Sequence, residues 1–224
     1  MSTYIALLRA VNVGGVTLPM SDLRALLEGL GYGSVRTYLQ SGNAVFEAGE
    51  DAGPPPALAT AIEVRISRDI GPRVGVLVVP GGAMAGVVAA NPFLSGLGGG
   101  AAAADEPGLA GGAAGPPPDE GILHATFLFG SSDGEADFGE ASQAAYSDVF
   151  KAAFNKLELP ADEGEEAAFV GIPPLAAPVV YLKLPHGYGR TKLTNAWFER
   201  RLGTAATTRN WRTVQALAEL AGTT

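Results

Sequence analysis

Cysteine is absent from this chain of 224 residues, which excludes disulfide bonds and thiolate metal sites. Histidine occurs only as His124 and His186, so a site built from several histidines is excluded too, and we expect no bound metal. Apolar runs are short: the run that starts at Tyr4 is broken by Arg9, before it reaches the length of a signal-peptide core or a membrane span. We therefore expect a soluble cytoplasmic protein with no membrane contact.

Positive charge is also scarce. The chain has 15 basic and 23 acidic residues and a formal net charge of −8, whereas proteins that bind polyanions over a broad surface are usually basic. Residues 183–212 differ from the rest, because seven basic residues and a single acidic one, Glu199, give this segment +6 and leave −14 for the remainder. An anion-binding site is therefore expected within this segment.

Hydrophobic periodicity predicts an α+β protein. In the first part of the chain we expect strands at 3–8, 35–39, 44–47 and 74–79, and helices at about 20–30, 54–70 and 83–90. Ser21 is the expected N-cap of the first helix, and Gly31 is the residue that ends it. Gly42-Asn43 predicts a hairpin between the second and third strands. The first six elements follow the ferredoxin-like order.

The same order recurs later in the chain. We expect strands at 122–129, 165–170, 179–184 and 205–208, and helices at 139–154, at about 192–202 and from Trp211 onward. The sequence thus predicts a tandem repeat of two ferredoxin-like β-α-β-β-α-β-α halves, residues 1–93 and 122–224. Residues 94–121 are rich in glycine and alanine and lack both periodicities, so they are predicted to be a flexible linker or insertion.

The segment from Gly187 to Lys192 reads Gly-Tyr-Gly-Arg-Thr-Lys. It lacks the Gly-Lys-Ser/Thr ending of the P-loop and the third glycine of the dinucleotide fingerprint, so no cofactor is predicted. Arg190, Thr191 and Lys192 would still form an anion seat at the start of the helix expected from about 192, where free N–H groups and the helix dipole favour an anion. The alternative is a turn whose cations are only solvated.

A second corner lies between the last strand and the terminal helix. Arg209 and Arg212 flank the start of that helix, where positive charge opposes the dipole unless an anion compensates it. We therefore assign Arg209 and Asn210 to the same predicted anion seat. In the alternative interpretation, Asn210 is an N-cap and carboxylates pair with the arginines. Trp211 is expected in the core in either case.

Two loops of the first half carry polar side chains that would line the site. These residues are Arg9, Asn12, Gln40, Ser41 and Asn43. Ordinary turn chemistry is the alternative explanation for Gly42-Asn43. A single site requires that Arg9, Asn43, Arg190 and Arg209 converge in one pocket.

A Gly-x-Ser-x-Gly pattern at residues 130–134 lies between a predicted strand and a predicted helix, as in the nucleophile elbow of hydrolases. Asp148 or Asp162, followed by His186, would complete the order Ser-Asp-His. The pattern is disfavoured here, because the predicted helix begins several residues too late. The parallel sheet that presents such a serine is also not predicted.

Several separated motifs resemble a known family. TYIALLRAVNVGG, LPMSDLRALLEGLGY and VRTYLQSGNAVF resemble the start of the bacterial domain-of-unknown-function family 1697, and GRTKLTNAWFERRLG and ATTRNWRTVQALAEL resemble its end. Ala10 departs from the glycine expected there, and Thr191 from the more common serine. The resemblance implies two ferredoxin-like α+β halves and a bacterial source. It brings no settled activity, so no catalytic residue is transferred.

The leading hypothesis is a protein that binds a phosphate-bearing ligand, either a nucleotide or a nucleic-acid segment, at residues 183–212. One alternative is a small cofactor-independent enzyme that uses the same anion seat. The other is a protein–protein interaction module that uses the basic face against an acidic partner.

Overall fold

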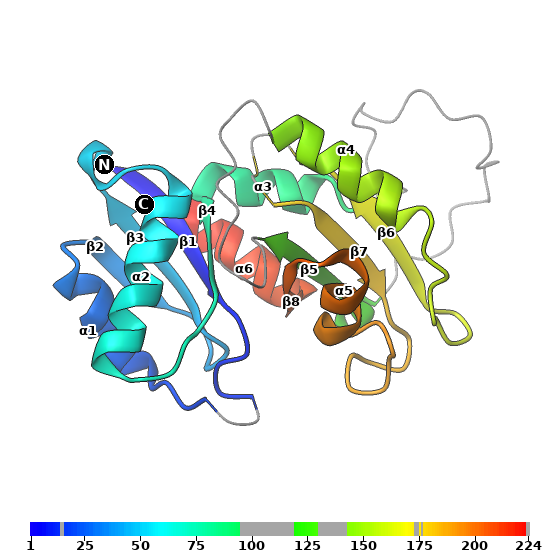
Figure 1. Cartoon of the computed structure of the whole chain (residues 1–224), viewed down its shortest axis with the longest axis horizontal. Helices are drawn as coiled ribbons and strands as arrows, with labels where there is room; N and C mark the ends of the chain where they lie inside the picture. The colour runs from blue at the N-terminus through cyan, green and yellow to red at the C-terminus, as the bar shows by residue number, and fades with distance from the viewer. Residues whose placement is uncertain (14–15, 95–118, 130–142, 173–174, 176, 223–224) are drawn as a thin grey trace.

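The computed structural model describes residues 1–13, 16–94, 119–129, 143–172, 175 and 177–222. They form an α+β protein with two four-stranded antiparallel sheets (Figure 1). The first sheet has the order β2-β3-β1-β4 and contains β1 (Ser2–Leu8), β2 (Gly33–Thr37), β3 (Asn43–Ala48) and β4 (Val76–Pro80). The second has the order β6-β7-β5-β8 and contains β5 (Leu123–Phe129), β6 (Glu166–Val170), β7 (Val179–Lys183) and β8 (Ala205–Asn210). Both sheets thus have the same relative strand order, which agrees with two similar halves.

The described residues include six α-helices and two short 3₁₀ turns. The helices are α1 (Met20–Gly29), α2 (Pro55–Asp69), α3 (Gly81–Ala89), α4 (Gln143–Phe154), α5 (Asn195–Leu202) and α6 (Trp211–Gly222); the turns are Glu50–Ala52 and Glu120–Ile122. In this part of the chain, no helix is long and apolar enough to cross a membrane. The predicted linker at 94–121 lies mostly outside the described residues, so the domain boundaries stay a prediction.

Three apolar cores build the molecule in layers. On the outer face of the first sheet, α1 and α2 bury leucine and isoleucine side chains against Phe46. On the outer face of the second sheet, α4 and α5 bury Phe150, Phe154 and Phe198. The middle core joins the inner faces of both sheets through α3 and α6, which lie between the sheets (Figure 1). Strand β1 contributes to two of these cores, because its side chains alternate between the two faces of the sheet: Ile5 faces the middle core and Ala6 faces the outer one.

The middle core makes the two halves depend on each other. Trp211 at the start of α6 is fully buried, which confirms its predicted core position. Its ring packs edge-on against Tyr181 of β7, with 6.1 Å between the ring centroids. The Tyr181 hydroxyl in turn donates a hydrogen bond of 2.7 Å to the Val87 carbonyl oxygen of α3. Each sheet therefore buries its inner face only when the other half is present.

The ends of α1 and the β2–β3 hairpin can be compared with the sequence prediction. Gly31 ends α1 with φ +85°, a left-handed conformation that glycine adopts at little cost. The predicted cap of that helix is wrong: Pro19 occupies the N-cap position, and the Ser21 hydroxyl donates to the carboxylate of Asp22 instead. The predicted hairpin is confirmed by the antiparallel pairing of β2 with β3. Asn43 is not part of its turn but the first residue of β3.

Candidate basic site at the strand ends of the second sheet

The two predicted corners of the anion seat lie at the same end of the second sheet. Strand β5 begins where β7 and β8 end, because Leu123 pairs with Lys183 and His124 pairs with Asn210. The backbone N–H of Leu184 also donates to the carbonyl oxygen of Ile122 at 2.8 Å. The loop that follows β7 and the start of α6 therefore leave the sheet at the same end, on either side of β5. We call this region, residues 185–194 and 210–212, the strand-end loops.

The helix after β7 begins later than predicted, so Thr191 and Lys192 do not stand at its N-terminus. Helix α5 starts at Asn195, and the hydroxyl of the N-cap residue Thr194 accepts a hydrogen bond from the backbone N–H of Trp197. Thr191 is buried, and its hydroxyl donates to the Glu165 carboxylate at 2.9 Å. The same hydroxyl accepts from the backbone N–H of Leu193. Thr191 thus fixes the loop rather than caps the helix.

The two cations of this loop differ in their partners. The ammonium of Lys192 lies 2.9 Å from the carboxylate of Asp162, and this hydrogen bond raises the pKa of the exposed lysine. Arg190 is exposed, and none of the described carboxylates forms an ion pair with it. Arg190 is therefore available to an anion from solution.

The second corner has the geometry of the capping alternative. The Asn210 side-chain oxygen accepts a hydrogen bond of 3.0 Å from the backbone N–H of Arg212, so Asn210 caps α6. Its amide nitrogen donates to the Gly121 carbonyl oxygen at 3.4 Å, and Glu120 beside it binds Gln215. The Arg212 side chain is exposed and, among the described residues, forms no ion pair. A second cation without a described ion-pair partner thus lies at the same end of the sheet as the loop that carries Arg190.

An aromatic and polar cluster lies under the strand-end loops. The Tyr188 ring stacks on His124 of β5, with ring centroids 5.5 Å apart and an interplanar angle of 28°. The Tyr188 hydroxyl oxygen accepts a hydrogen bond from the backbone N–H of Asn195 at 3.1 Å. The Asn195 side chain accepts from Thr208, which also bonds Thr126 on β5. Burial lowers the pKa of His124, so the imidazole is neutral at physiological pH.

Arg209 lies on the opposite face of β8 and points into the first half. The residue is 7% exposed, and its guanidinium donates to neutral acceptors on both sides of the junction. These acceptors are the side-chain oxygens of Asn43 and Thr207 and the carbonyl oxygens of Leu8, Ser41, Gly42 and Thr208. Burial lowers the pKa of Arg209 to about 10, which still leaves it charged at neutral pH. With its N–H groups engaged, Arg209 holds the halves together.

The predicted lining residues of the first half also make contacts within the protein. Arg9 forms a two-pronged ion pair with Glu199 of α5, at 2.5 and 2.7 Å. Glu199 also accepts from the backbone N–H of Ala206, so it is shared between α5 and β8. Asn12 ties its loop to the hairpin by donating to the carbonyl oxygens of Leu18 and Gln40. Gln40 and Ser41 lie at the hairpin tip.

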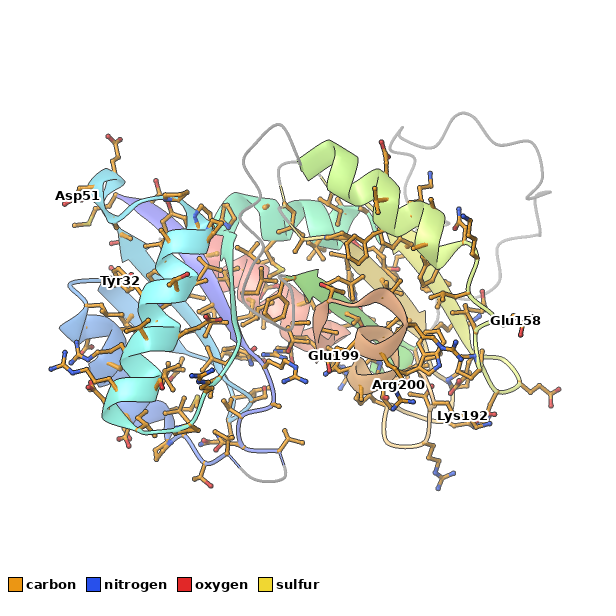
Figure 2. All side chains as sticks on the ribbon, viewed as in Figure 1. Tyr32, Asp51, Glu158, Lys192, Glu199 and Arg200 are labelled. Atoms are coloured by element: carbon orange, nitrogen blue, oxygen red, sulfur yellow. The ribbon has the colours of Figure 1, made fainter. Side chains whose placement is uncertain are left out.

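The four residues named for a single pocket therefore divide into two groups. Arg9, Asn43 and Arg209 meet at the junction of the halves, and Arg190 lies in the strand-end loops. Figure 2 shows Glu199, the partner of Arg9, near the middle of the molecule and Lys192 farther out along the lower side of the second half. The structure places the 190–192 and 210–212 corners at the same end of the second sheet, on either side of β5, and the lining residues at the junction.

Sequence reasoning missed two features of this region. Tyr188 and His124 were not predicted as partners, although an aromatic residue between Gly187 and Gly189 is unusual for a plain turn. Leu39 was not singled out either, yet it has φ +56° and is 57% exposed. No signal in the sequence marks that conformation.

The remaining sequence hypotheses concern a hydrolase-like serine pattern and a metal site. The Gly-x-Ser-x-Gly pattern at 130–134 lies outside the described residues. Of its proposed partners, Asp162 pairs with Lys192, and His186 is exposed in the strand-end loops. Within the described ranges, no three His, Asp or Glu side chains gather as a metal site.

Comparisons with known proteins give a family match over the first part of the chain and no activity. Residues 1–103 match the model of a family described as protein of unknown function (DUF1697). The chain is similar to the structure of the conserved bacterial protein SP0830 from Streptococcus pneumoniae, with 19% sequence identity, a TM-score of 0.62 and 99% of each chain covered. No curated protein matches the chain. The family resemblance of the sequence motifs is confirmed, and the likeness to SP0830 shows a shared fold across both halves.

Proposed function

We propose that this chain, which matches a family of unknown function over residues 1–103, binds a phosphate-bearing ligand on the basic surface of residues 183–212. The ligand is a nucleotide or a nucleic-acid segment. One observation carries the proposal: Arg190 and Arg212 are exposed at the same end of the second sheet, and no described carboxylate pairs with either.

The chemistry of these cations suits phosphate. A guanidinium presents a planar fork of N–H donors that matches two phosphate oxygens, and an ammonium adds a mobile point charge. Lys192 is paired with Asp162, but both side chains are largely exposed, at 65% and 46%. Exposed ion pairs contribute little stability, so a phosphate group can replace Asp162 at small cost. Arg190, Lys192 and Arg212 are therefore the proposed contacts.

The remaining residues of the predicted seat have supporting roles in this proposal. Thr191 fixes the loop through Glu165, and Asn210 caps α6. Arg209 contributes its positive charge from behind the sheet but no free N–H group, since its donors bind the protein. The proposed contacts are thus fewer than the sequence suggested, and all three follow strands that end at the same end of the second sheet.

We also infer that each half is a ferredoxin-like unit. The support is the shared order of four antiparallel strands, in which the first strand of each half lies between the third and the fourth.

Binding of labelled oligonucleotides and of ATP, measured by fluorescence anisotropy and calorimetry at several salt concentrations, tests the proposal. We expect wild-type protein to bind at low salt, and the double variant Arg190→Ala/Arg212→Ala to bind at least tenfold more weakly. For a nucleic acid, each lost contact should reduce the salt slope by about one. Arg68→Ala is the matched control, because Arg68 is 79% exposed on α2 of the other half.

Two outcomes would overturn the proposal. The first is that wild-type protein binds neither ATP nor any oligonucleotide at low salt. The second is that the double variant binds as tightly as Arg68→Ala while circular dichroism shows that both are folded.

A further inference from the structure

We infer that the ligand of the strand-end loops is a single-stranded nucleic-acid segment, and that Tyr188 stacks on one of its bases. This inference rests on the proposed function and narrows its ligand. The feature that suggests it is an aromatic ring placed among exposed cations. Single-strand binding proteins combine these two groups, because bases stack on aromatic rings while the cations contact the backbone phosphates.

Tyr188 has open space beside it. The residue lies between Gly187, which has φ +80°, and Gly189. A Cβ atom placed on either glycine would have no heavy atom within 4 Å outside the adjacent residues. No residue other than the chain neighbours therefore covers the backbone at Gly187 and Gly189, and the Tyr188 side chain itself is half-buried. The loop is thus open at both glycines beside the ring, while part of the Tyr188 side chain packs against the outer core of the second half.

The ring is also held in place before any ligand arrives. Its hydroxyl oxygen is fixed by the backbone N–H of Asn195, and one side of the ring packs on His124. Because burial lowers the pKa of His124, its imidazole ring is neutral and adds no charge next to the Tyr188 ring. A base would become the third ring on a preformed pair. Such preorganisation reduces the entropy lost on binding.

The two unpaired cations near this ring come from different elements at the same end of the second sheet. Arg190 follows Tyr188 by two residues in the same loop, and Arg212 lies at the start of α6, next to the strand end that pairs with His124. Two cations on separate elements suit successive phosphates of a strand better than the single phosphate cluster of a nucleotide. A duplex is less suitable, because paired bases hide their faces within the helix stack.

The nearby carboxylates are largely engaged. Asp162 binds Lys192, Glu165 binds Thr191, and Glu120 binds Gln215. Each of these bonds directs a carboxylate toward a protein donor. Within the strand-end loops, Arg190 and Arg212 form no ion pair with a described carboxylate.

The test compares two labelled strands of equal length, oligothymidylate and an abasic strand with the same phosphates, by fluorescence anisotropy. We expect wild-type protein to bind oligothymidylate roughly 5- to 150-fold more tightly than the abasic strand, the range for stacking of one base. Tyr188→Leu should bring this ratio close to one while it keeps binding of the abasic strand. Tyr188→Phe, which retains the ring, should keep most of the ratio.

The outcomes separate the two proposals. Equal binding of both strands by wild-type protein overturns the stacking inference but leaves the phosphate site, and so does a ratio that survives in Tyr188→Leu. Tighter binding of duplex than of the single strand also overturns it. Failure of wild-type protein to bind any strand while it still binds ATP overturns the stacking inference and leaves the proposed function. Failure to bind both the strands and ATP overturns the proposed function itself.

Discussion

The guanidinium of Arg209 in β8 donates a hydrogen bond of 2.7 Å to the carbonyl oxygen of Leu8 at the end of β1, across 201 residues of sequence. The same side chain reaches the Asn43 oxygen and the backbone of the hairpin tip. Within the described residues no carboxylate neutralises it. Arg209 therefore joins the two halves through neutral acceptors, and its removal leaves several buried acceptors without a donor.

We predict that Arg209→Ala lowers the free energy of unfolding by about 3 kcal/mol or more, because each buried acceptor left unpaired costs about 1–3 kcal/mol. Arg209→Lys should restore little, since an ammonium cannot reproduce the planar fork. Urea denaturation followed by circular dichroism measures both effects.

Arg212→Ala is the control for the Arg209 substitutions, since it removes an exposed arginine three residues along the chain. A surface change of this kind should alter the free energy of unfolding by less than about 0.5 kcal/mol. Equal unfolding midpoints for Arg209→Ala and Arg212→Ala would show that the buried guanidinium does not hold the halves together.

The ion pair of Arg9 with Glu199 is a second link between the halves. We predict a coupling free energy of about 0.5–1 kcal/mol in a double-mutant cycle of Arg9→Ala and Glu199→Gln, because Arg9 is 41% exposed and solvent screens the pair. Glutamine keeps the acceptor for Ala206. The coupling should decrease as salt is added.

The pH dependence of this pair follows from Arg9. Its hydrogen bond to Glu199 raises the pKa of Arg9 above the ordinary arginine value. A raised folded-state pKa of a base contributes stability that is complete below the unfolded-state pKa and is lost only as pH rises through the folded-state value. The coupling should therefore be constant between about pH 6 and 9. A coupling that falls in this range would contradict the assignment.

The sequence predicted features that depend on neighbours in the chain. The core position of Trp211 and the C-terminal role of Gly31 are confirmed, because each follows from contacts within a few residues. The Asn210 cap, which is the alternative to an anion contact, is also present and is equally local. The element order is confirmed for the same reason, since apolar periodicity reflects which side of a strand or helix is buried.

Features that depend on distant partners were not predictable. By sequence, Thr191 and Thr194 are equally good N-caps. In the structure Thr194 caps α5, whereas the hydroxyl of Thr191 donates a hydrogen bond to Glu165, 26 residues earlier in the chain. Likewise, the local sequence predicts that Arg209 is a surface cation in a basic segment. Only the packing of β8 against the end of β1 shows that it is buried. Tertiary contacts of this kind leave no trace in local residue patterns.

Acid should weaken the protein partly through His124. Burial lowers the pKa of His124 below its ordinary value of 6.5, so the unfolded chain takes up a proton more readily than the folded one. The stability held by the neutral ring is complete above about pH 6.5 and is lost as pH falls through the folded-state pKa. We predict that His124→Gln flattens the decline of unfolding free energy between about pH 7 and 5. His186→Gln, which changes an exposed histidine, should leave the decline as it is.

Strain at the hairpin tip gives the last prediction. Leu39 has φ +56°, a conformation that costs a residue with a Cβ atom roughly 1–2 kcal/mol, and its side chain is too exposed to recover this cost by packing. Asparagine tolerates this region better, so Leu39→Asn should raise the free energy of unfolding by about 0.5–1 kcal/mol. Val13→Asn is the control, because Val13 is 71% exposed and has no positive φ. An equal gain in both variants, measured by urea denaturation, would mean that loss of exposed apolar surface and not relief of strain is the cause.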